Sequence, residues 1–397
     1  MSQSTNRDSL AMACPKWSIF CVAAFLIPLP PVLGSDWPAF RGPDHNGVLD
    51  TSLQLFDEPK EIWRVDGLGT KYRGAPVIAG GRIYVTGGVP EDRSAPMLYC
   101  LNAETGTEIW KSPADRTHST PVIHNGKIYV QDDRLKVRCF DAGSGDELWS
   151  KEMPESTQRR GWGHSGSPRV WEDLLIVNYG YGVALDLETG EAAWEFEGFA
   201  GLATPVIFTY RNKPAVAIFC GDKLIARDAR SGTELWSIPW VTKSGVNACD
   251  PLFLDNDSKV YLSSRYGLGR SLYDVSSGEP QELWTGNAGA TFSSSIYVDD
   301  KLYTLDGSLG RLDLANGQRV ARGPAGHSML LIDRNFIVLN GDGEIRIGKM
   351  LNDKFSESMR ARVIDGQTWN VPAYADGRLY IRNHEGVLVC VQIGEES

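Results

Sequence analysis

The feature of this chain that most constrains its fold is a phrase that recurs along it. Each copy has Asp or Asn, then a Ser/Thr-Gly turn, then Trp four residues after the Gly. Two further copies are altered, one by an insertion before Trp284 and one by Ala321 in place of Trp. Successive copies lie roughly 40–50 residues apart, a period typical of propellers and solenoids. The complete copies are 102–106 with Trp110, 141–145 with Trp149, 186–190 with Trp194, and 228–232 with Trp236.

Each repeat predicts one sheet of four short strands. In the second copy the strands are expected at 119–123, 127–130, 137–140 and 147–149. The pair Asn125-Gly126 separates the first two, and it favours a tight hairpin because both central positions of a type I′ turn need positive φ. Beyond the N-terminal segment no stretch has helical periodicity of useful length, so the pattern indicates an all-β chain.

The number of blades follows from counting the strands at both ends of the repeat. Eight segments have the character of a first strand and eight that of a fourth strand. The earliest fourth strand, Glu61–Arg64, precedes the first full repeat, so we expect it to pair with residues 370–393 and close the ring. This predicts an eight-bladed β-propeller of four-stranded antiparallel blades. First strands begin near Gly74, Ser119, Gly166, Ala203, Cys249, Ser293, Ser328 and Asn370; fourth strands contain Trp63, Trp110, Trp149, Trp194, Trp236, Trp284, Ala321 and Val363.

The repeated Trp is interpreted as the residue that docks one blade on the next. A large aromatic at a fixed offset fills the outer gap between sheets, so Trp63, Trp110, Trp149, Trp194, Trp236 and Trp284 are expected to be structural and largely buried. Cys100, Cys139 and Cys390 share one third-strand position, where other copies have Ala. This recurrence favours small packing residues over disulfides or a zinc site.

The first 34 residues differ from the rest and predict a signal peptide. Arg7 and Lys16 precede a short apolar run, 19–27, which is followed by prolines and by small residues ending at Gly34. The run is too short to span a bilayer, which takes about 20 residues. We therefore expect an exported protein, periplasmic or extracellular, with no integral membrane segment after cleavage. The expected organisation is an extension at 35–60 and a single propeller at 61–397.

The charge of the chain narrows the choice of partners. The formal net charge is −10, and no basic stripe stands out. Nucleic acid and anionic membranes are therefore excluded as expected partners. We expect a monomer.

The repeat resembles the pyrroloquinoline-quinone-type β-propeller repeat over residues 61–393. Two kinds of protein share that repeat: quinone-dependent alcohol and sugar dehydrogenases, and non-enzymatic propellers such as the outer-membrane β-barrel assembly subunit. The opening 36–43, followed by Asn46-Gly47-Val48, also resembles a group of secreted propellers from planctomycete-type bacteria. The resemblance is specific for the fold and not for the chemistry, since one fold hosts many functions.

The resemblance to the quinone dehydrogenases implies features that can be looked for. Those enzymes are longer and have an adjacent Cys pair, a calcium site of Glu, Asn and Asp, and a catalytic Asp. This chain has no adjacent Cys pair. Asn247 and Asp250 are possible oxygen ligands of Ca²⁺ and Trp369 a possible stacking plane for the quinone, but loop capping and packing are the favoured interpretation. No catalytic or metal-ligating residue is assigned.

The residues expected at the channel mouth are the best candidates for a ligand site. Three residues before the Pro of each first strand, or its counterpart, the copies differ, whereas a purely structural position would repeat. Three His gather here, and imidazole is a common proton-transfer group and metal ligand. The residues at this position are Arg73, His118, Ser165, Leu202, Ala248, Phe292, His327 and Trp369, with His164 one place away.

Two hypotheses about function follow. The preferred one is a secreted, non-catalytic propeller that binds a protein or a glycan through one ring face, where loops such as Arg265-Tyr266 and His384-Glu385 carry residue types enriched at interfaces. The alternative is a compact quinone- or metal-dependent oxidoreductase that uses the channel mouth. If a small ligand binds, we expect it within reach of Arg73, His118, His164, Asn247, Asp250, His327 and Trp369.

Overall fold

A computed structural model describes Met1 and residues 36–69, 74–88, 95–133, 136–153 and 163–396. The predicted signal peptide lies outside the described residues. Within one compact unit, Leu33–Ser397, these residues form strands and turns and contain no helix. No described segment is therefore a helix that could cross a bilayer.

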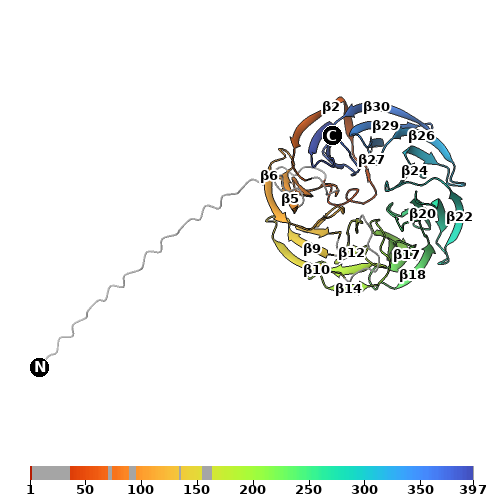
Figure 1. Ribbon diagram of the computed structural model, residues 1–397, viewed down its shortest axis with the longest axis horizontal. Coiled ribbons are helices and arrows are strands. Elements are labelled where there is room, and N and C mark those ends of the chain that lie inside the picture. The colour runs from red at the N-terminus through yellow and green to blue at the C-terminus, as the bar shows by residue number, and fades with distance from the viewer. Residues whose placement is uncertain (2–35, 70–73, 89–94, 134–135, 154–162, 397) are drawn as a thin grey trace. The chain divides into compact units, whose positions relative to one another are not determined.

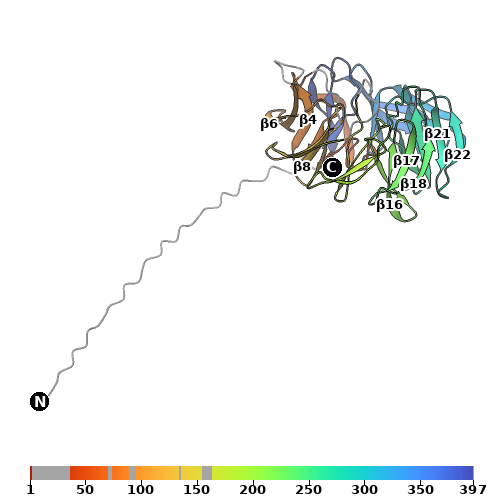
Figure 2. The ribbon, with the colours of Figure 1, turned by 60° about the horizontal axis from the view of Figure 1, so that its bottom comes forward.

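The strands form eight four-stranded antiparallel units arranged around a ring (Figure 1), as the repeats predict. Figure 2 shows the same blades from another side. Blades one to four are β3 (Val77–Ala79), β4 (Arg82–Gly88), β5 (Pro96–Asn102), β6 (Glu108–Pro113); β7 (Val122–His124), β8 (Lys127–Gln131), β9 (Lys136–Asp141), β10 (Glu147–Glu152); β11 (Arg169–Trp171), β12 (Leu174–Val177), β13 (Val183–Asp186), β14 (Ala192–Glu195); and β15 (Val206–Tyr210), β16 (Lys213–Phe219), β17 (Lys223–Asp228), β18 (Glu234–Pro239). Blades five to eight are β19 (Leu252–Leu254), β20 (Lys259–Ser264), β21 (Gly269–Asp274), β22 (Gln281–Gly286); β23 (Ile296–Val298), β24 (Lys301–Leu305), β25 (Ser308–Leu312), β26 (Arg319–Ala325); β27 (Ser328–Ile332), β28 (Asn335–Leu339), β29 (Glu344–Leu351), β30 (Lys354–Arg362); and β31 (Ala373–Ala375), β32 (Arg378–Arg382), β33 (Leu388–Glu396), β2 (Leu53–Val65).

The ring is closed by the N-terminal strand β2, which confirms the prediction. It pairs antiparallel with β33 of the last blade, and Trp63 lies opposite Cys390. Because β2 and β33 come from opposite ends of the chain, their pairing covers the edge of β33 that would otherwise be open.

Blades six and seven are joined into one sheet, which the repeat pattern does not predict. The outer strands β26 and β30 pair in parallel at Arg322 and Lys354. A further short strand, β1 (Val48–Leu49), pairs in parallel with β27, so this sheet has nine strands.

The Trp of one copy of the repeated phrase contacts the turn that follows the Asp in the next blade. The indole N–H of Trp194 donates to the carbonyl of Ala229, the residue after the turn Asp of the next blade, at 3.2 Å. The turn Gly has positive φ, and a Cβ on Gly232 would lie 2.7 Å from the Trp194 ring. The same donation to the following blade is made by Trp63 to Ala103, Trp149 to Leu187, and Trp284 to Leu314.

Burial of the repeated Trp differs between blades. Trp194 and Trp236 are buried, as expected, whereas Trp110 and Trp149 are half-buried. All four residues nevertheless keep most of their surface covered, and a Cβ on Gly145 would lie 2.6 Å from the Trp110 ring.

The prediction that Val363 holds the Trp position of blade seven is wrong. In β30 the residue in the register of the Trp is Met359, opposite Ile347, and Val363 follows the end of the strand. The reason is the turn. A tight hairpin at Asn352-Asp353, both with positive φ, replaces the longer Asp-x-x-Ser/Thr-Gly turn and starts the fourth strand earlier.

The cysteines pack as small apolar residues. Cys100, Cys139 and Cys390 lie directly opposite Trp110, Trp149 and Trp63 in their own sheets, where Ala184 and Ala226 take the same place in other blades. All five described cysteines are free and buried. A small side chain is favoured there because the indole on the neighbouring strand occupies the space.

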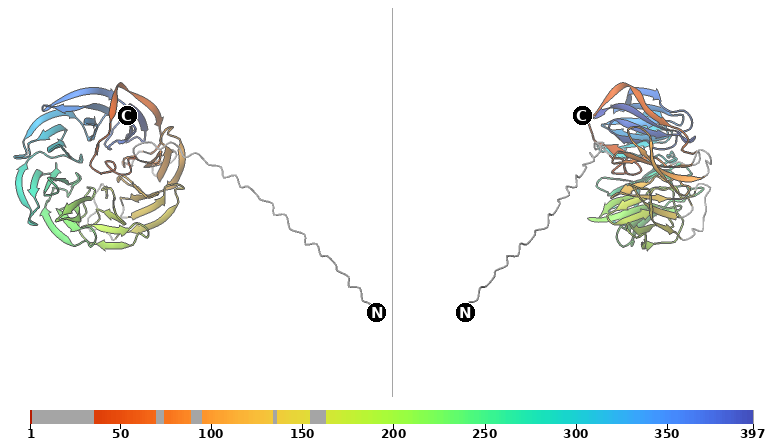
Figure 3. Two further views of the ribbon diagram at one scale, coloured as in Figure 1. Left: turned by 180° about the vertical axis from the view of Figure 1, so that it is seen from behind. Right: turned by 90° about the vertical axis from the view of Figure 1, so that its left-hand side faces the viewer.

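The segment that precedes β2 crosses the ring from blade one to blade seven (Figure 3). Trp37 bridges to Ile78, and the amide of Ile123 donates to the carbonyl of Pro38. Further along, the amide of Leu331 donates to the carbonyl of Gly47. These contacts involve the first strands β3, β7 and β27 themselves, whereas the channel-mouth positions precede those strands. We call residues 36–49 the crossing segment.

Candidate binding site at the channel mouth

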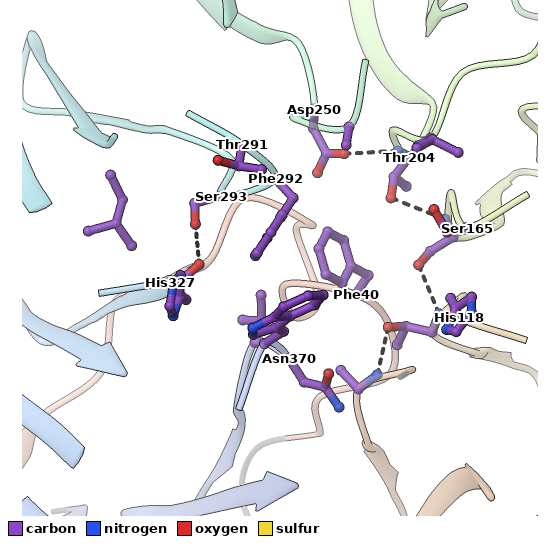
Figure 4. A pocket seen from close by; sticks show the side chains of 18 of the residues that line it. Phe40, His118, Ser165, Thr204, Asp250, Thr291, Phe292, Ser293, His327 and Asn370 are labelled. Atoms are coloured by element: carbon purple, nitrogen blue, oxygen red, sulfur yellow. Dashed lines mark hydrogen bonds between the residues drawn. The ribbon is translucent and has the colours of Figure 1, made fainter. Parts of the chain in front are cut away.

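The channel mouth contains a cavity of about 460 Å³ that receives residues from all eight blades. It lies at the end of the channel where the first strands begin, and Phe40 of the crossing segment projects into it (Figure 4). We call this cavity the cup. Of the residues that the sequence predicts at the mouth, it is lined by His118, Ser165, Leu202, Ala248, Phe292, His327 and Trp369.

One wall of the cup is aromatic. Phe292 stacks on His327, with ring centroids 6.2 Å apart, and tilts against Trp369 at 5.6 Å. Trp369 in turn meets the ring of His384 edge to face at 4.8 Å. A Cβ on Gly341 would lie 2.5 Å from the His327 ring. Glycine at position 341 therefore leaves room for the imidazole. The rings come from blades six, seven and eight and support one another.

Below the mouth, a belt of hydrogen bonds connects successive blades. In each link, the backbone N–H of one blade donates to the side chain at the same position in the next blade. Because the links hold each first strand to its neighbour, they fix the spacing of the residues that line the cup. The donors and acceptors are Ala75 to Thr120, Thr120 to Ser167, Ser167 to Thr204, Thr204 to Asp250, and Asp250 to Ser294.

Asp250 is the carboxylate of the cup, and it is already neutralised. Its Oδ1 accepts the N–H of Thr204 at 2.9 Å, and its Oδ2 lies 3.8 Å from a guanidinium nitrogen of Arg41, which belongs to the crossing segment. Burial raises the pKa of Asp250, and Arg41 opposes that rise. Arg41 also donates to the carbonyls of Asn46 and Ser295, so it fastens the crossing segment to blades five and six.

Two of the predicted residues lie outside the cup. Asn247 is fully buried, and its amide donates to the carbonyls of Cys220 and Trp240, so it holds a loop together. His164 is buried against Tyr179, with ring centroids 4.8 Å apart. Arg73 lies outside the described residues.

The sequence analysis missed residues of two kinds. Phe40 lies more than a blade's length away in sequence from every residue it faces, and nothing in its neighbourhood signals its position. The belt residues Thr120, Ser167 and Thr204 do leave a signal, because each directly precedes a Pro in its copy of the repeat, as the predicted candidate Asp250 does.

The residues that line the cup do not fit a calcium and quinone site. Pyrroloquinoline quinone is a planar tricarboxylate, so it needs several cations, and Ca²⁺ needs six to eight oxygen ligands. Among the described lining residues Arg265 is the guanidinium and Asp250 the carboxylate, and Asp250 is committed to Arg41 and Thr204. Asn247 turns to backbone carbonyls. In the described part of the chain no three His, Cys, Asp or Glu side chains converge to hold a metal ion.

Comparison with known sequences finds relatives of two kinds. The chain is 24% identical over 282 residues to outer membrane protein assembly factor BamB of Burkholderia pseudomallei, a match that covers 57% of this chain and 68% of that protein. It is 26% identical over 141 residues to quinohemoprotein alcohol dehydrogenase ADH-IIG of Pseudomonas putida, a match that covers 30% of this chain and 19% of the enzyme. The chain thus spans only a fifth of that dehydrogenase.

Solved structures share the fold. BamB from Moraxella catarrhalis superposes with a TM-score of 0.63 at 17% identity, over 84% of this chain and 98% of that chain. The quinohemoprotein alcohol dehydrogenase ADHIIG from Pseudomonas putida HK5 superposes with a TM-score of 0.65 at 13% identity, over 91% and 81%. At these identities the likeness establishes the propeller fold alone.

A family model decides the membership. The model described as outer membrane protein assembly factor BamB matches residues 49–200 and 165–322, which together make up more than half of the chain and include five whole blades and most of the sixth. With the ring of four-stranded blades and the repeated Asp-turn and Trp, the chain belongs to this family of pyrroloquinoline-quinone-type β-propellers.

Proposed function

We propose that this protein is an exported, non-catalytic propeller that binds a macromolecule, a protein or a glycan, through the ring face that bears the cup. In this proposal residues 1–34 are removed as a signal peptide and the remaining chain acts as a single monomeric domain. The relative from Burkholderia pseudomallei is named as an assembly factor, which agrees with a role in binding.

The observation that carries the proposal is the state of the polar groups around the cup. Asp250 is neutralised by Arg41, and the belt side chains accept backbone N–H groups. The surface left to a ligand is therefore mostly apolar, with hydroxyl and imidazole groups set into it, as in pockets that combine apolar walls with placed polar groups. Oxidation would need a base beside the reacting atoms, a role open to the imidazoles of His118 and His327 in the cup, so titration with the quinone is needed as a separate test.

Site-specific photocrosslinking tests the proposal. A photoreactive benzoyl-phenylalanine introduced in place of Tyr266, on the rim of the cup, should trap a discrete adduct in the organism's own envelope. The matched position is Asn212, which is exposed in the hairpin between β15 and β16 at the other end of the channel. We expect an adduct from position 266 and none from position 212. Equal labelling from both positions would contradict binding through the cup face.

A second experiment addresses the oxidoreductase alternative. Purified protein is titrated with pyrroloquinoline quinone in the presence of Ca²⁺, and dye-linked oxidation of alcohols is recorded. The proposal expects no saturable quinone binding and no turnover. Stoichiometric binding with turnover that is lost in Ala248→Trp, which fills the cup, would replace the proposal by the enzymatic alternative.

A further inference from the structure

We infer that the cup accepts one bulky apolar side chain of an extended peptide, and that acidic residues beside that side chain lie on Lys243 and Arg265 at the rim. The inference rests on the proposed function, because it takes the cup face to be the binding face. It commits to a peptide and to a direction, with the acidic end over blades four and five.

The rim of the cup carries an apolar patch that the fold does not need. Val241, Tyr266 and Leu268 are 69%, 37% and 40% exposed. The loops that carry them are joined where the amide of Lys243 donates to the carbonyl of Tyr266 at 3.0 Å, and Tyr266 also lines the cup. Of the six other exposed aliphatics of the described propeller, Ile62, Ile109, Leu148, Leu283 and Val320 sit one by one beside the Trp position on separate outer strands, and Leu351 ends β29. The patch on blades four and five is therefore a local exception, and it continues the apolar lining of the cup.

Two positively charged side chains at the same rim have no ion-pair partner among the described carboxylates. Lys243 and Arg265 are both exposed, and neither forms an ion pair with a described carboxylate. By contrast, Arg41 pairs with Asp250, and Arg116 beside blade two pairs with Asp133. A chain of net charge −10 thus presents positive charge at blades four and five. Charge complementarity favours an acidic ligand there and gives it a direction, because Glu385 on the blade-eight side is acidic.

The size and chemistry of the cup favour a peptide side chain over a sugar. A cavity of about 460 Å³ is near the lower end of ligand pockets, roughly 300–1,000 Å³, so it takes a few rings or chains and not a folded domain. Sugar hydroxyls require acceptors beside the stacking ring, and the carboxylate of Asp250 is already used by Arg41 and Thr204, which leaves a sugar only the weaker, uncharged acceptors of hydroxyl, imidazole and amide side chains. An aromatic or branched side chain needs only the apolar walls that Phe292, Trp369 and Phe40 provide.

The probe is a fluorescein-labelled peptide with acidic residues on one side of Phe only, Gly-Ser-Gly-Ser-Phe-Glu-Asp-Glu-Gly, titrated with the mature protein and followed by anisotropy. A second peptide has Ser in place of Phe and the same charge. We expect saturable binding of the Phe peptide, weakened by salt, and a loss of about tenfold or more with the Ser peptide, because an apolar anchor in a desolvated pocket dominates such binding.

Protein variants assign the two parts of the site. Ala248→Trp fills the cup and should abolish binding of the Phe peptide, whereas Ala193→Trp on the exposed outer strand β14 should not change it. The double variant Lys243→Glu and Arg265→Glu should weaken binding about tenfold and remove the salt dependence. Its control, Lys213→Glu and Lys301→Glu, makes the same change of charge on strands β16 and β24 at the hairpin end of the channel, and should leave affinity within about twofold. Thermal unfolding monitors that each variant is folded.

The outcomes separate this inference from the proposed function. Equal binding of the Phe and Ser peptides, or binding that survives Ala248→Trp, overturns the inference, since the cup would not hold the side chain. Absence of peptide binding together with binding of a soluble oligosaccharide that Ala248→Trp abolishes also overturns it but leaves the proposed function standing. If the adduct at position 266 is absent as well, the proposed function fails with it.

Discussion

At the residue scale, the repeated Trp, Gly and small third-strand residue form one packing unit. The indole of Trp194 lies over the turn Gly of the next blade, donates to the carbonyl beside that turn, and faces Ala184 on its own sheet, and Trp63 and Trp149 make the same three contacts with Cys in place of Ala. Each of the three residues is constrained by the other two. This is why they recur together at a fixed spacing. In blade seven, where Met359 takes the place of the Trp, the Asp-x-x-Ser/Thr-Gly turn is replaced as well.

Replacing the indole should therefore be costly. Trp194→Ala is expected to lower the free energy of unfolding by about 3–5 kcal/mol, because it leaves a cavity over Gly232 and an unpaired carbonyl at Ala229. Denaturant unfolding measures the loss. Leu148→Ala, which removes an exposed side chain from β10, is the control and should change stability by no more than about 0.5 kcal/mol. Equal effects of the two variants would contradict the docking role.

The pair of Arg41 and Asp250 makes a second prediction at this scale. Arg41→Met leaves Asp250 buried without its cation, and breaking a buried pair in this way costs about 3–5 kcal/mol at neutral pH. Adding Asp250→Asn, whose amide oxygen can still accept the N–H of Thr204, should restore most of the loss. Guanidinium unfolding of the two variants measures both effects.

The pH dependence of the Arg41→Met variant has a definite sign. The folded-state pKa of Asp250 is already above its ordinary value of 3.8 because of burial, and loss of Arg41 raises it further. Between the unfolded and folded pKa the folded protein binds more protons, so the stability of the variant should rise as pH falls through the folded pKa. A variant whose stability falls over that range would show that Asp250 is not desolvated.

At the element scale, the turn between the third and fourth strands is held by its own side chain. Asp186 accepts the backbone N–H groups of Glu188 and Thr189 and the hydroxyl of Thr189. Asn102 makes the same two backbone contacts in blade one. The turn therefore needs an acceptor oxygen and not a charge, and the turns of blades one and three differ in whether that acceptor titrates.

Exchanging Asp186 for Asn should change acid sensitivity and not the fold. Hydrogen bonds from the N–H and hydroxyl of Thr189 lower the pKa of Asp186 below its ordinary 3.8. The folded pKa is below the unfolded one, so this stabilisation is present above pH 3.8 and is lost as pH falls through the folded pKa. Asp186→Asn should match the parent at acid pH and lack its pH dependence, whereas Asp186→Ala should be less stable at every pH. Thermal melts across acid and neutral pH test this.

At the scale of the whole molecule, a strand from the N-terminal part of the chain completes the last blade. The sheet β2-β33-β32-β31 is assembled from both ends of the chain, and Trp63 of β2 docks on the turn of blade one through the carbonyl of Ala103. Arg382 of blade eight makes a second connection between the two ends of the ring, because its buried guanidinium donates to the carbonyls of Leu68 and Gly69. The ring is therefore locked where the first and last blades meet.

Removing β2 should open the ring. A chain that lacks residues 1–65 is expected to self-associate through the exposed edge of β33 and to unfold at lower denaturant than a chain that lacks residues 1–50, which differs from it only in residues 51–65. Sedimentation and denaturant unfolding compare the two chains. A synthetic peptide of residues 51–66, added in trans, should restore the monomer. Identical behaviour of the two truncated chains would mean that closure by β2 does not stabilise the ring.

The sequence by itself determined the features that depend on local chemistry or on repetition. Turn residues with positive φ, such as Asn125 and Gly126, specify hairpins wherever they occur, and the equal counts of first and fourth strands require Trp63 to close the ring. Propeller symmetry then brings equivalent positions together, so the repeat alone places His118, His327 and Trp369 at one mouth.

Only the tertiary structure decided the features that break the repeat. Phe40 and Arg41 meet residues of blades five and six that are some two hundred or more positions away, as in the contact of Arg41 with Ser295. No local pattern encodes such a contact, because it depends on where a non-repeating segment runs after the ring has formed. Likewise, whether Asp250 and Asn247 converge as ligands depends on side-chain orientation, and the structure turns one toward Arg41 and the other toward backbone carbonyls. The repeated sequence thus determines the propeller, whereas the packing of the residues that break the repeat determines the site.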